Sequence, residues 1–256
     1  MIPKIIHYCW FGRNPLPPLA IKCIESWKKY LPDYEIKEWN EDNFDVNAIA
    51  YTKEAYEAKK YAFVSDYARF WILYNYGGIY FDTDVEVIKP INDIVAKGSF
   101  IGRERTSIDG DTPAEIGINP GLGCGALPGQ VFLKEMLDEY QDRHFIIDGS
   151  QNLKTIVEYT SARFISKGYI NNESIQYCAG FYIYPKEYFC PLSMDGLILS
   201  KTSNTRTIHH YMASWGGGNF NRIWKIIKSR ILIPILPKQI VQKIVSYKSK
   251  KRQSNS

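Results

Sequence analysis

The pattern of apolar and polar positions in this 256-residue chain predicts an α/β protein, with short apolar strands separated by helices. Its centre is the segment 61–87. Bulky side chains recur at steps of three and four residues over 62–76, and apolar residues also occupy the opposite face, so we expect a buried helix. Gly77-Gly78 ends this helix, because glycine adopts the left-handed cap conformation without a Cβ penalty. Ile79-Tyr80-Phe81 then reads as a strand in the interior of a sheet.

The same patterns predict further elements on both sides of this segment. An apolar run at 4–10 is typical of the first buried strand of a parallel sheet, and a histidine in its middle, His7, is expected to be a satisfied core residue. We expect further strands and helices in this order: a helix at 19–30, a strand at 34–39, a helix at 52–60, a strand at 85–87, a helical turn at 91–96, strands at 100–102 and 118–126, a helix at 130–144, and strands at 181–185 and 207–211. The polar, glycine-containing stretch 104–117 is expected to be a mobile loop.

Composition narrows the class of protein. Apolar residues make up 45% of the chain and aromatic residues 14%, which is enough for one large packed domain. The five cysteines are odd in number and form no CxxC pair, so we expect reduced thiols rather than a disulfide framework or a zinc site. The first residues lead directly into a strand, not into a signal peptide, and no apolar run approaches the roughly 20 residues of a membrane-spanning helix.

Charge is distributed unevenly along the chain. The segment 222–256 carries ten basic residues and no acidic one, which leaves 22 basic against 27 acidic residues in the rest. We therefore divide the chain into a domain at 1–219 and a basic amphipathic helical appendage at 220–256. Such helices are typical of membrane-surface binding, here by residues 222–252, although helices packed on the domain with a solvated lysine face are the alternative. The local excess does not indicate nucleic-acid binding.

The triplet Asp82-Thr83-Asp84 is the first candidate for chemistry. It follows the strand at 79–81, at the end of the strand where open α/β sheets place their ligands. Two carboxylates this close repel each other unless a cation lies between them, and Mg²⁺ or Mn²⁺ would suit them. A solvated acidic turn is the alternative for a bare DxD.

Asp66 and Arg69 are the second candidate. They are three residues apart and so lie on one side of the buried helix. A buried aspartate and a buried arginine need partners, which are either each other or a ligand.

Together these residues resemble a known family. The DxxR of Asp66 and Arg69, followed by YGGIYxDxD with sixteen residues from Asp66 to Asp82, resembles the DXD glycosyltransferases of family 32, of the Och1-like and capsular-polysaccharide type. It is more distantly similar to the glucosyltransferase domains of clostridial toxins. The resemblance runs from residue 2 to about 215. It implies a GT-A fold with a Rossmann-like mixed sheet, a nucleotide-sugar donor, a divalent metal, and transfer with retention of configuration.

The resemblance also implies roles for donor-binding residues. Trp10, at the end of the first strand, would stack on the base, although an aromatic residue at a strand end is equally typical of a core. Asn40 closes the strand at 34–39 and is a candidate for the ribose or the base edge. Tyr80 and Asp82 are assigned to the donor as well. Asn119, in a glycine-punctuated strand, would lie next to the donor sugar.

Retaining relatives carry an amide or an acid on the sugar face opposite the leaving phosphate. Asn152, with Asp148 behind it, is our candidate, beside Asp66 and Arg69 as the other catalytic residues. An Asp-Gly turn followed by an asparagine helix cap is the alternative reading of that stretch.

The family pattern near the C-terminus is a histidine followed by Ser-Trp. His209 fits it better than His210, and a neutral imidazole would complete a metal site with Asp82 and Asp84. Alternation along a strand allows only one of the two histidines to face the site. Ser214 and Trp215 would hold the β-phosphate, and glycines 216–218 would supply a hinge.

We therefore expect a metal-dependent retaining hexosyltransferase that uses Mn²⁺ or Mg²⁺ and a nucleotide sugar, a UDP-hexose more than GDP-mannose. Its acceptor would be a lipid-linked glycan or an oligosaccharide in bacterial capsular polysaccharide or lipopolysaccharide synthesis, at the inner face of the plasma membrane. Arg69 would add a second cation at the diphosphate, and Asp66 would bind sugar hydroxyls. The alternatives are a haloacid-dehalogenase-like phosphatase using Asp82 and Asp84, and a non-catalytic carbohydrate-binding protein.

Overall fold

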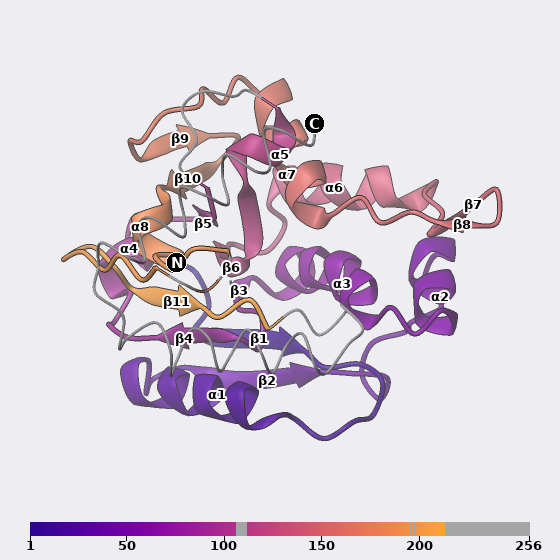
Figure 1. Cartoon of the computed structure of the whole chain (residues 1–256), viewed down its shortest axis with the longest axis horizontal. Helices are drawn as coiled ribbons and strands as arrows, with labels where there is room; N and C mark the ends of the chain where they lie inside the picture. Colours follow the sequence, from indigo (N-terminus) through magenta and orange to yellow (C-terminus); the bar gives the residue numbers. More distant parts are fainter. Residues whose placement is uncertain (106–111, 195, 197, 213–256) are drawn as a thin grey trace. The chain divides into compact units, whose positions relative to one another are not determined.

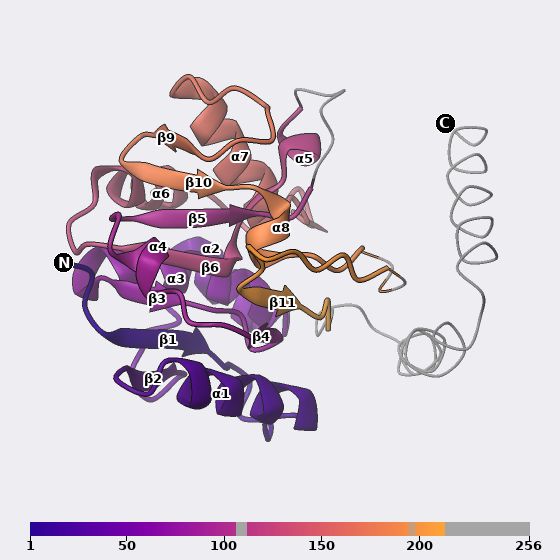
Figure 2. The ribbon, with the colours of Figure 1, turned by 90° about the vertical axis from the view of Figure 1, so that its left-hand side faces the viewer.

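A seven-stranded mixed sheet organises the chain, with strand order β2-β1-β3-β6-β5-β10-β9 (Figures 1 and 2). The structure is a computed structural model that describes residues 1–105, 112–194, 196 and 198–212. The sheet lies in one unit, Met1–Pro191 with the chain from Lys201, and Leu192–Ser200 falls in a second, whose described part includes a bridge between Leu192 and Leu199. Ser214, Trp215 and the appendage at 220–256 lie outside the described residues, so the domain division remains a prediction.

The main sheet consists of β1 (Ile5–Cys9), β2 (Glu35–Trp39), β3 (Gly78–Tyr80), β5 (Phe100–Arg103), β6 (Ile118–Ala126), β9 (Gln176–Cys178) and β10 (Phe181–Tyr184). Two small antiparallel pairs accompany it: β4 (Val85–Val87) with β11 (Thr207–His209), and β7 (Ile146–Ile147) with β8 (Ser150–Gln151). The helices are α1 (Pro18–Tyr30), α2 (Ala50–Glu57), α3 (Tyr61–Tyr76), α4 (Asn92–Val95), α5 (Pro113–Ile116), α6 (Val131–Gln141), α7 (Ile156–Ser166) and α8 (Lys186–Phe189). The predicted fold class, an α/β protein on a mixed sheet, is confirmed.

Strand direction brings the predicted site residues to one end of this sheet. β1 runs parallel to β2 and β3, and β6 runs antiparallel to β3 and β5, so the carboxyl ends of β1, β2, β3 and β5 coincide. The residues that follow these strands therefore gather at this end. The beginning of β6 arrives there too, because β6 runs in the opposite direction.

Two hydrophobic clusters cover the two faces of the sheet, and β1 contributes to both. Its Cys9 packs in the cluster that contains the core of α3, α6 and α7, whereas Ile6 and Tyr8 pack with Trp27 of α1. This alternation is what a strand covered on both faces requires. His7 is fully buried, and both of its ring nitrogens are bonded, one to Trp39 and one to the carbonyl of Gly77. The expectation of a satisfied core histidine is confirmed.

The central helix and its glycine stop follow the prediction closely. Ten of the residues of α3 are buried, and β3 is paired on both sides by β1 and β6. Gly77 has φ 65° and ψ −154°, a positive-φ conformation that favours glycine but lies outside the left-handed helical cap that we expected. At Gly78, with φ 92°, an added Cβ would lie 2.7 Å from the carbonyl oxygen of Ile5, so a side chain would separate β3 from β1.

Several features differ from the sequence prediction. The polar loop at 104–117 contains a short helix, α5, at its end, and α8, β9 and the β7–β8 hairpin were not predicted. A helix after Asn152 was only the alternative for that stretch, and α7 is that helix, although it begins at Ile156. The last predicted strand ends at His209 rather than at residue 211. Among the described residues, the helices are too short or too polar to cross a bilayer.

Candidate active site

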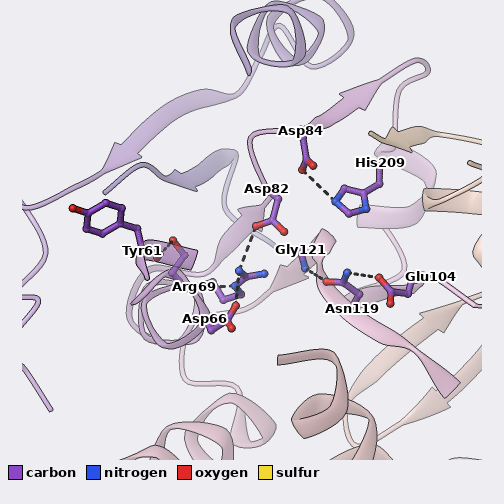
Figure 3. A network of polar contacts seen from close by, with 10 residues as sticks. Tyr61, Asp66, Arg69, Asp82, Asp84, Glu104, Asn119, Gly121 and His209 are labelled. Atoms are coloured by element: carbon purple, nitrogen blue, oxygen red, sulfur yellow. Dashed lines mark hydrogen bonds and ion pairs between the residues drawn. The ribbon is translucent and has the colours of Figure 1, made fainter. Parts of the chain in front are cut away.

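Three metal-ligating side chains converge beyond the end of β3. Asp82 and Asp84 lie between β3 and β4, and the antiparallel pairing of β11 with β4 places His209 opposite Val85. One potential ligand atom from each of Asp82, Asp84 and His209 lies within 4.8 Å of the others (Figure 3). Two carboxylates and an imidazole at this spacing fit a divalent cation such as Mn²⁺ or Mg²⁺.

The structure separates the two consecutive histidines. The Nε2 atom of His209 is 3.2 Å from Asp84 Oδ1, and its side chain is almost fully buried. His210 is directed elsewhere, with its Nε2 atom 2.8 Å from Glu86 Oε2. Of the two candidates that the sequence left open, His209 is therefore the one in the cluster.

Asp84 is held in its charged form without a cation. Burial alone would raise its pKa, but His209 and the backbone N–H of Met212, which donates to Oδ2 at 2.6 Å, lower the pKa of Asp84 to about 2. For His209, burial opposes the charged imidazolium, but the adjacent carboxylate outweighs burial and raises its pKa well above the usual value. Asp84 and His209 therefore form an ion pair, and His209 could ligate a cation only as the neutral imidazole, after releasing the proton directed at Asp84.

Arg69 joins the two acidic motifs. Its Nη2 atom lies 2.9 Å from Asp66 Oδ1 and 3.4 Å from Asp82 Oδ1, and its Nε–H donates to the carbonyl of Ser65 (Figure 3). The guanidinium also lies over the ring of Tyr80, 4.8 Å from the ring centroid. Asp66 and Arg69 thus partner each other, as one of our two readings proposed.

The pair is not fully satisfied, however. The Nη1 atom of Arg69 is buried and has no hydrogen-bond partner among the described residues. A buried donor without a partner is costly, and donors of this kind are often completed by a ligand. Burial raises the pKa of Asp66 to about 7, against the opposing effect of Arg69.

A chain of hydrogen bonds links Asp82 to the beginning of β6. The backbone N–H of Asp82 donates to the carbonyl of Gly121 at 2.8 Å, and the N–H of Gly121 donates to Asn119 Oδ1 at 2.7 Å. Asn119 Nδ2 in turn donates to Glu104 Oε2 at 2.8 Å (Figure 3). Asn119, a predicted donor-binding residue, is therefore connected to Asp82 through Gly121, which bonds to both.

The two residues predicted for the nucleoside lie at neighbouring strand ends. Trp10 follows β1, is half-buried, and donates its indole N–H to the carbonyl of Asn14 at 2.6 Å. Asn40 follows β2, donates to Glu38 at 2.9 Å, and accepts the N–H of Asp42. Both roles remain predictions.

Asn152 and Asp148 belong to the hairpin region rather than to this network. Asp148, with φ 49°, occupies the exposed turn between β7 and β8, as the Asp-Gly reading proposed. Asn152 donates its side-chain amide to the hydroxyl of Tyr159 and its backbone N–H to the carbonyl of Phe145. It does not cap a helix, because Thr155 caps α7. Their catalytic roles remain predictions.

Sequence reasoning missed Glu104 and Gly121. Glu104 is an isolated acidic residue at the start of a polar loop, and nothing in the pattern distinguishes it from a solvated one. Gly121 was part of a glycine-rich strand in which close approach to the backbone was expected, but the partner that approaches it could not be named from the sequence.

Part of the chain matches a known protein family. Residues 17–101 match the family described as "Glycosyltransferase sugar-binding region containing DXD motif". Two relatives from Schizosaccharomyces pombe are named inositol phosphoceramide mannosyltransferase 1 and 3. The first is 28% identical over 39% of this chain and 33% of its own length, the second 30% identical over 47% and 34%. The matches thus cover about a third of each relative.

Among solved structures, the chain is similar to one named PaToxG glycosyltransferase. The TM-score is 0.43 and the sequence identity 21%, over 54% of this chain and 59% of that one. The predicted resemblance to DXD-motif glycosyltransferases is confirmed by the family match, which contains Asp66, Arg69, Asp82 and Asp84.

Proposed function

We propose that this chain, with a DXD-motif glycosyltransferase region at residues 17–101, transfers a hexose with retention of configuration from a nucleotide diphosphate sugar. The observation that carries the proposal is the convergence of Asp82, Asp84 and His209 beside Arg69 (Figure 3). A lone DxD occurs in many solvated turns. A carboxylate pair with an imidazole on one side and a partly unsatisfied guanidinium on the other is suited to a diphosphate that is bound through a divalent cation.

Each group in the site has a distinct task in this reaction. Mn²⁺ or Mg²⁺ held by Asp82, Asp84 and His209 would neutralise charge on the diphosphate leaving group. Arg69 is buried, fixed by Asp66 and retains an unpartnered Nη1 donor, so it offers a second positive group that needs no reorganisation. Asp66, beside that guanidinium, is assigned to hydroxyls of the donor sugar.

The remaining predicted residues complete the donor site. Trp10 and Asn40 are assigned to the nucleoside, Tyr80 and Asn119 to the sugar side, and Asn152 with Asp148 to the opposite sugar face. Ser214 and Trp215, outside the described residues, are assigned to the β-phosphate.

The names of the relatives bear on donor and acceptor. Both are named mannosyltransferases of an inositol phosphoceramide, which is a lipid. This supports a lipid-linked acceptor for the present chain, alongside the oligosaccharide acceptor of a bacterial capsular polysaccharide or lipopolysaccharide. It also makes GDP-mannose a necessary comparison to the UDP-hexoses that we favour.

Slow release of the nucleotide from its sugar tests the proposal directly. The protein is incubated with Mn²⁺ and, separately, with UDP-glucose, UDP-galactose and GDP-mannose, and free UDP or GDP is measured. We expect release from one donor, dependent on Mn²⁺, and abolished in Asp84→Ala with a folded protein by circular dichroism. Full activity in that variant would overturn the metal assignment.

Two other results would replace the proposal. Hydrolysis of a simple phosphate monoester, with no release from any nucleotide sugar, would indicate the phosphatase alternative. Sugar binding without turnover of any donor would indicate a carbohydrate-binding protein.

We also propose that residues 222–252 bring the enzyme to the inner face of the bacterial plasma membrane. The support is in the sequence: ten basic residues and no acidic one, set among isoleucines and valines. Each lysine or arginine near an anionic surface contributes about 1 kcal/mol, and the attraction is screened by salt. We expect the full chain, but not a truncation after Gly218, to cosediment with anionic vesicles. Equal partitioning of the two proteins would contradict this.

A further inference from the structure

Glu104 is a buried acidic residue outside the predicted site and follows β5 at the same end of the sheet as Asp82. Only 6% of its surface is exposed. One carboxylate oxygen, Oε2, accepts the amide N–H of Asn119 at 2.8 Å, and the other, Oε1, lies 3.6 Å from Arg105. A carboxylate kept in the interior requires partners, and Asn119 is its direct one.

Asn119 opens a wide bulge in β6. Ile101 of β5 pairs with Cys124, but the next residue, Gly102, pairs with Asn119, so residues 120–123 have no counterpart on β5. The Asn119 side-chain oxygen accepts the N–H of the residue two positions later, Gly121, which is the geometry of an Asx turn. The bulge therefore starts from the side chain of Asn119.

The bulge presents Gly121 to Asp82. The carbonyl of Gly121 accepts the backbone N–H of Asp82, and the two residues are so close that a Cβ on Gly121 would lie 1.9 Å from Asp82 Oδ2. It would also lie 2.9 Å from Arg69 Nη1. The backbone of the bulge at Gly121 therefore packs directly against the side chains of Asp82 and Arg69.

We propose that Glu104 is a positioning residue for the DXD site, which acts through the orientation of the Asn119 amide and the bulge that this amide holds. The inference rests on the proposed function for its effect on turnover, but its effect on metal binding stands independently. Among the described residues, no hydrogen bond or ion pair joins Glu104 to Asp82, Asp84 or His209. Glu104 instead holds Asn119, which holds Gly121 against Asp82.

The chemistry of the amide explains why an acid is needed. An asparagine amide has one accepting end and one donating end, and only the accepting end can bind the Gly121 N–H. A carboxylate accepts but does not donate, so Glu104 holds the donating end and excludes the flipped orientation, which would set an NH₂ group against the N–H of Gly121. If residue 104 had no acceptor, the Asn119 amide could flip and lose its bond to the Gly121 N–H. The turn at Asn119 would then open, and Asp82 and Arg69 could shift.

The test is Glu104→Ala, measured first by titrating nucleotide-free protein with Mn²⁺ alone and following the free ion by electron paramagnetic resonance. Substitution of groups that orient metal ligands typically weakens metal affinity about 10- to 100-fold. Because Glu104 acts through two further residues, we expect about the lower end of that range. In donor hydrolysis we expect kcat to fall about tenfold, with a smaller change in the KM of the donor.

Ser161→Ala is the matched control. The Ser161 hydroxyl accepts the backbone N–H of Ile118, the residue before Asn119, so the control removes a buried hydrogen bond from the same strand without touching the amide. Both variants should melt at a lower temperature than the wild type, but only Glu104→Ala should bind Mn²⁺ more weakly. Unchanged Mn²⁺ affinity in Glu104→Ala, with a lower melting temperature, would mean that Glu104 has a stability role alone and would overturn the inference.

A double variant tests the route through Asn119. If Glu104 acts only through this amide, Asn119→Ala and Glu104→Ala/Asn119→Ala should have the same Mn²⁺ affinity and the same kcat. A further loss in the double variant would mean that Glu104 contacts the ligand itself, which would overturn a positioning role. If the wild type binds Mn²⁺ but releases nucleotide from no donor, the proposed function fails, and the Mn²⁺ titrations still decide the role of Glu104.

Discussion

Gly121→Ala is a minimal change that should disable the site by displacing one carboxylate. The φ of Gly121 is not positive, so alanine fits the backbone there, and the effect comes from the added methyl group alone. That Cβ would lie 1.9 Å from Asp82 Oδ2 and 2.6 Å from Asp82 Cγ. Ordinary contact begins at 3.4 Å, so the carboxylate or the strand must move by about 1.5 Å.

A shift of this size is large compared with the tolerance of a metal site. Metal–ligand distances are fixed to within about 0.2 Å, so Asp82 would cease to be a ligand in its present position. We expect Mn²⁺ affinity to fall about 10- to 100-fold, the range seen when ligand orientation is disturbed. Overpacking should also lower the free energy of unfolding by about 1–3 kcal/mol.

Mn²⁺ titration by electron paramagnetic resonance and denaturant unfolding separate these two effects. Gly129→Ala is the control, because its Cβ would meet nothing within 4 Å while its φ of 72° strains an alanine. Both variants should be less stable, and only Gly121→Ala should lose metal affinity. If Gly121→Ala binds Mn²⁺ like the wild type, Asp82 is not a metal ligand in the position described, and the reasoning on the bulge is wrong.

Two further predictions concern buried charged and titratable groups. Arg69→Lys keeps the charge but loses the fork that reaches Asp66 and Asp82, so turnover per folded molecule should fall by more than about tenfold; a stability loss with an unchanged rate would indicate a structural salt bridge instead. Burial lowers the pKa of His7 from 6.5 to about 4, so between these pH values the unfolded state binds more protons than the folded state. The contribution of the neutral His7 to the free energy of unfolding should therefore be fully present above pH 6.5 and fall by about 3 kcal/mol towards pH 4. Denaturant unfolding should show this pH-dependent loss in the wild type and much less of it in His7→Gln; equal slopes would contradict the neutral histidine.

The elements most accurately predicted from the sequence are those whose signal is local. The helix α3 combines helical periodicity with a double-glycine stop, and the two observations place its end at Tyr76. The burial of β3 followed from three consecutive apolar residues. The DxxR and DxD spacing could be read for the same reason: it depends on one helix, one turn and one strand that are adjacent in the chain.

The parts of the site that depend on register could not be derived from the residue pattern alone. That pattern does not separate His209 from His210; the family pattern favoured His209, and the pairing of β11 with β4 places it beside Asp84. The role of Glu104 depends on a shift between β5 and β6 that has no local signal, because the glycine and proline of the bulge are compatible with many loops. Hairpin β7–β8 was visible only as an Asp-Gly turn, since its two-residue strands are too short for a period-two pattern.

The burial of the three proposed ligands indicates how the site would meet a cation. The side chains of Asp84 and His209 are 11% and 10% exposed and are already ion-paired, whereas Asp82 is 30% exposed. The contact of Asp82 with Arg69, at 3.4 Å, is longer than a normal charge-assisted hydrogen bond. Asp82 is thus the least constrained of the three proposed ligands. Arg69 contacts it on one side, and the backbone of Gly121 contacts it on the other. Asp84 and His209 hold each other in place, but His209 can bind a cation only after it releases the proton directed at Asp84. Asp82 is the ligand with the most freedom to move, so Arg69 and Gly121, which restrain it, should set how well the three ligands fit a diphosphate-bound cation.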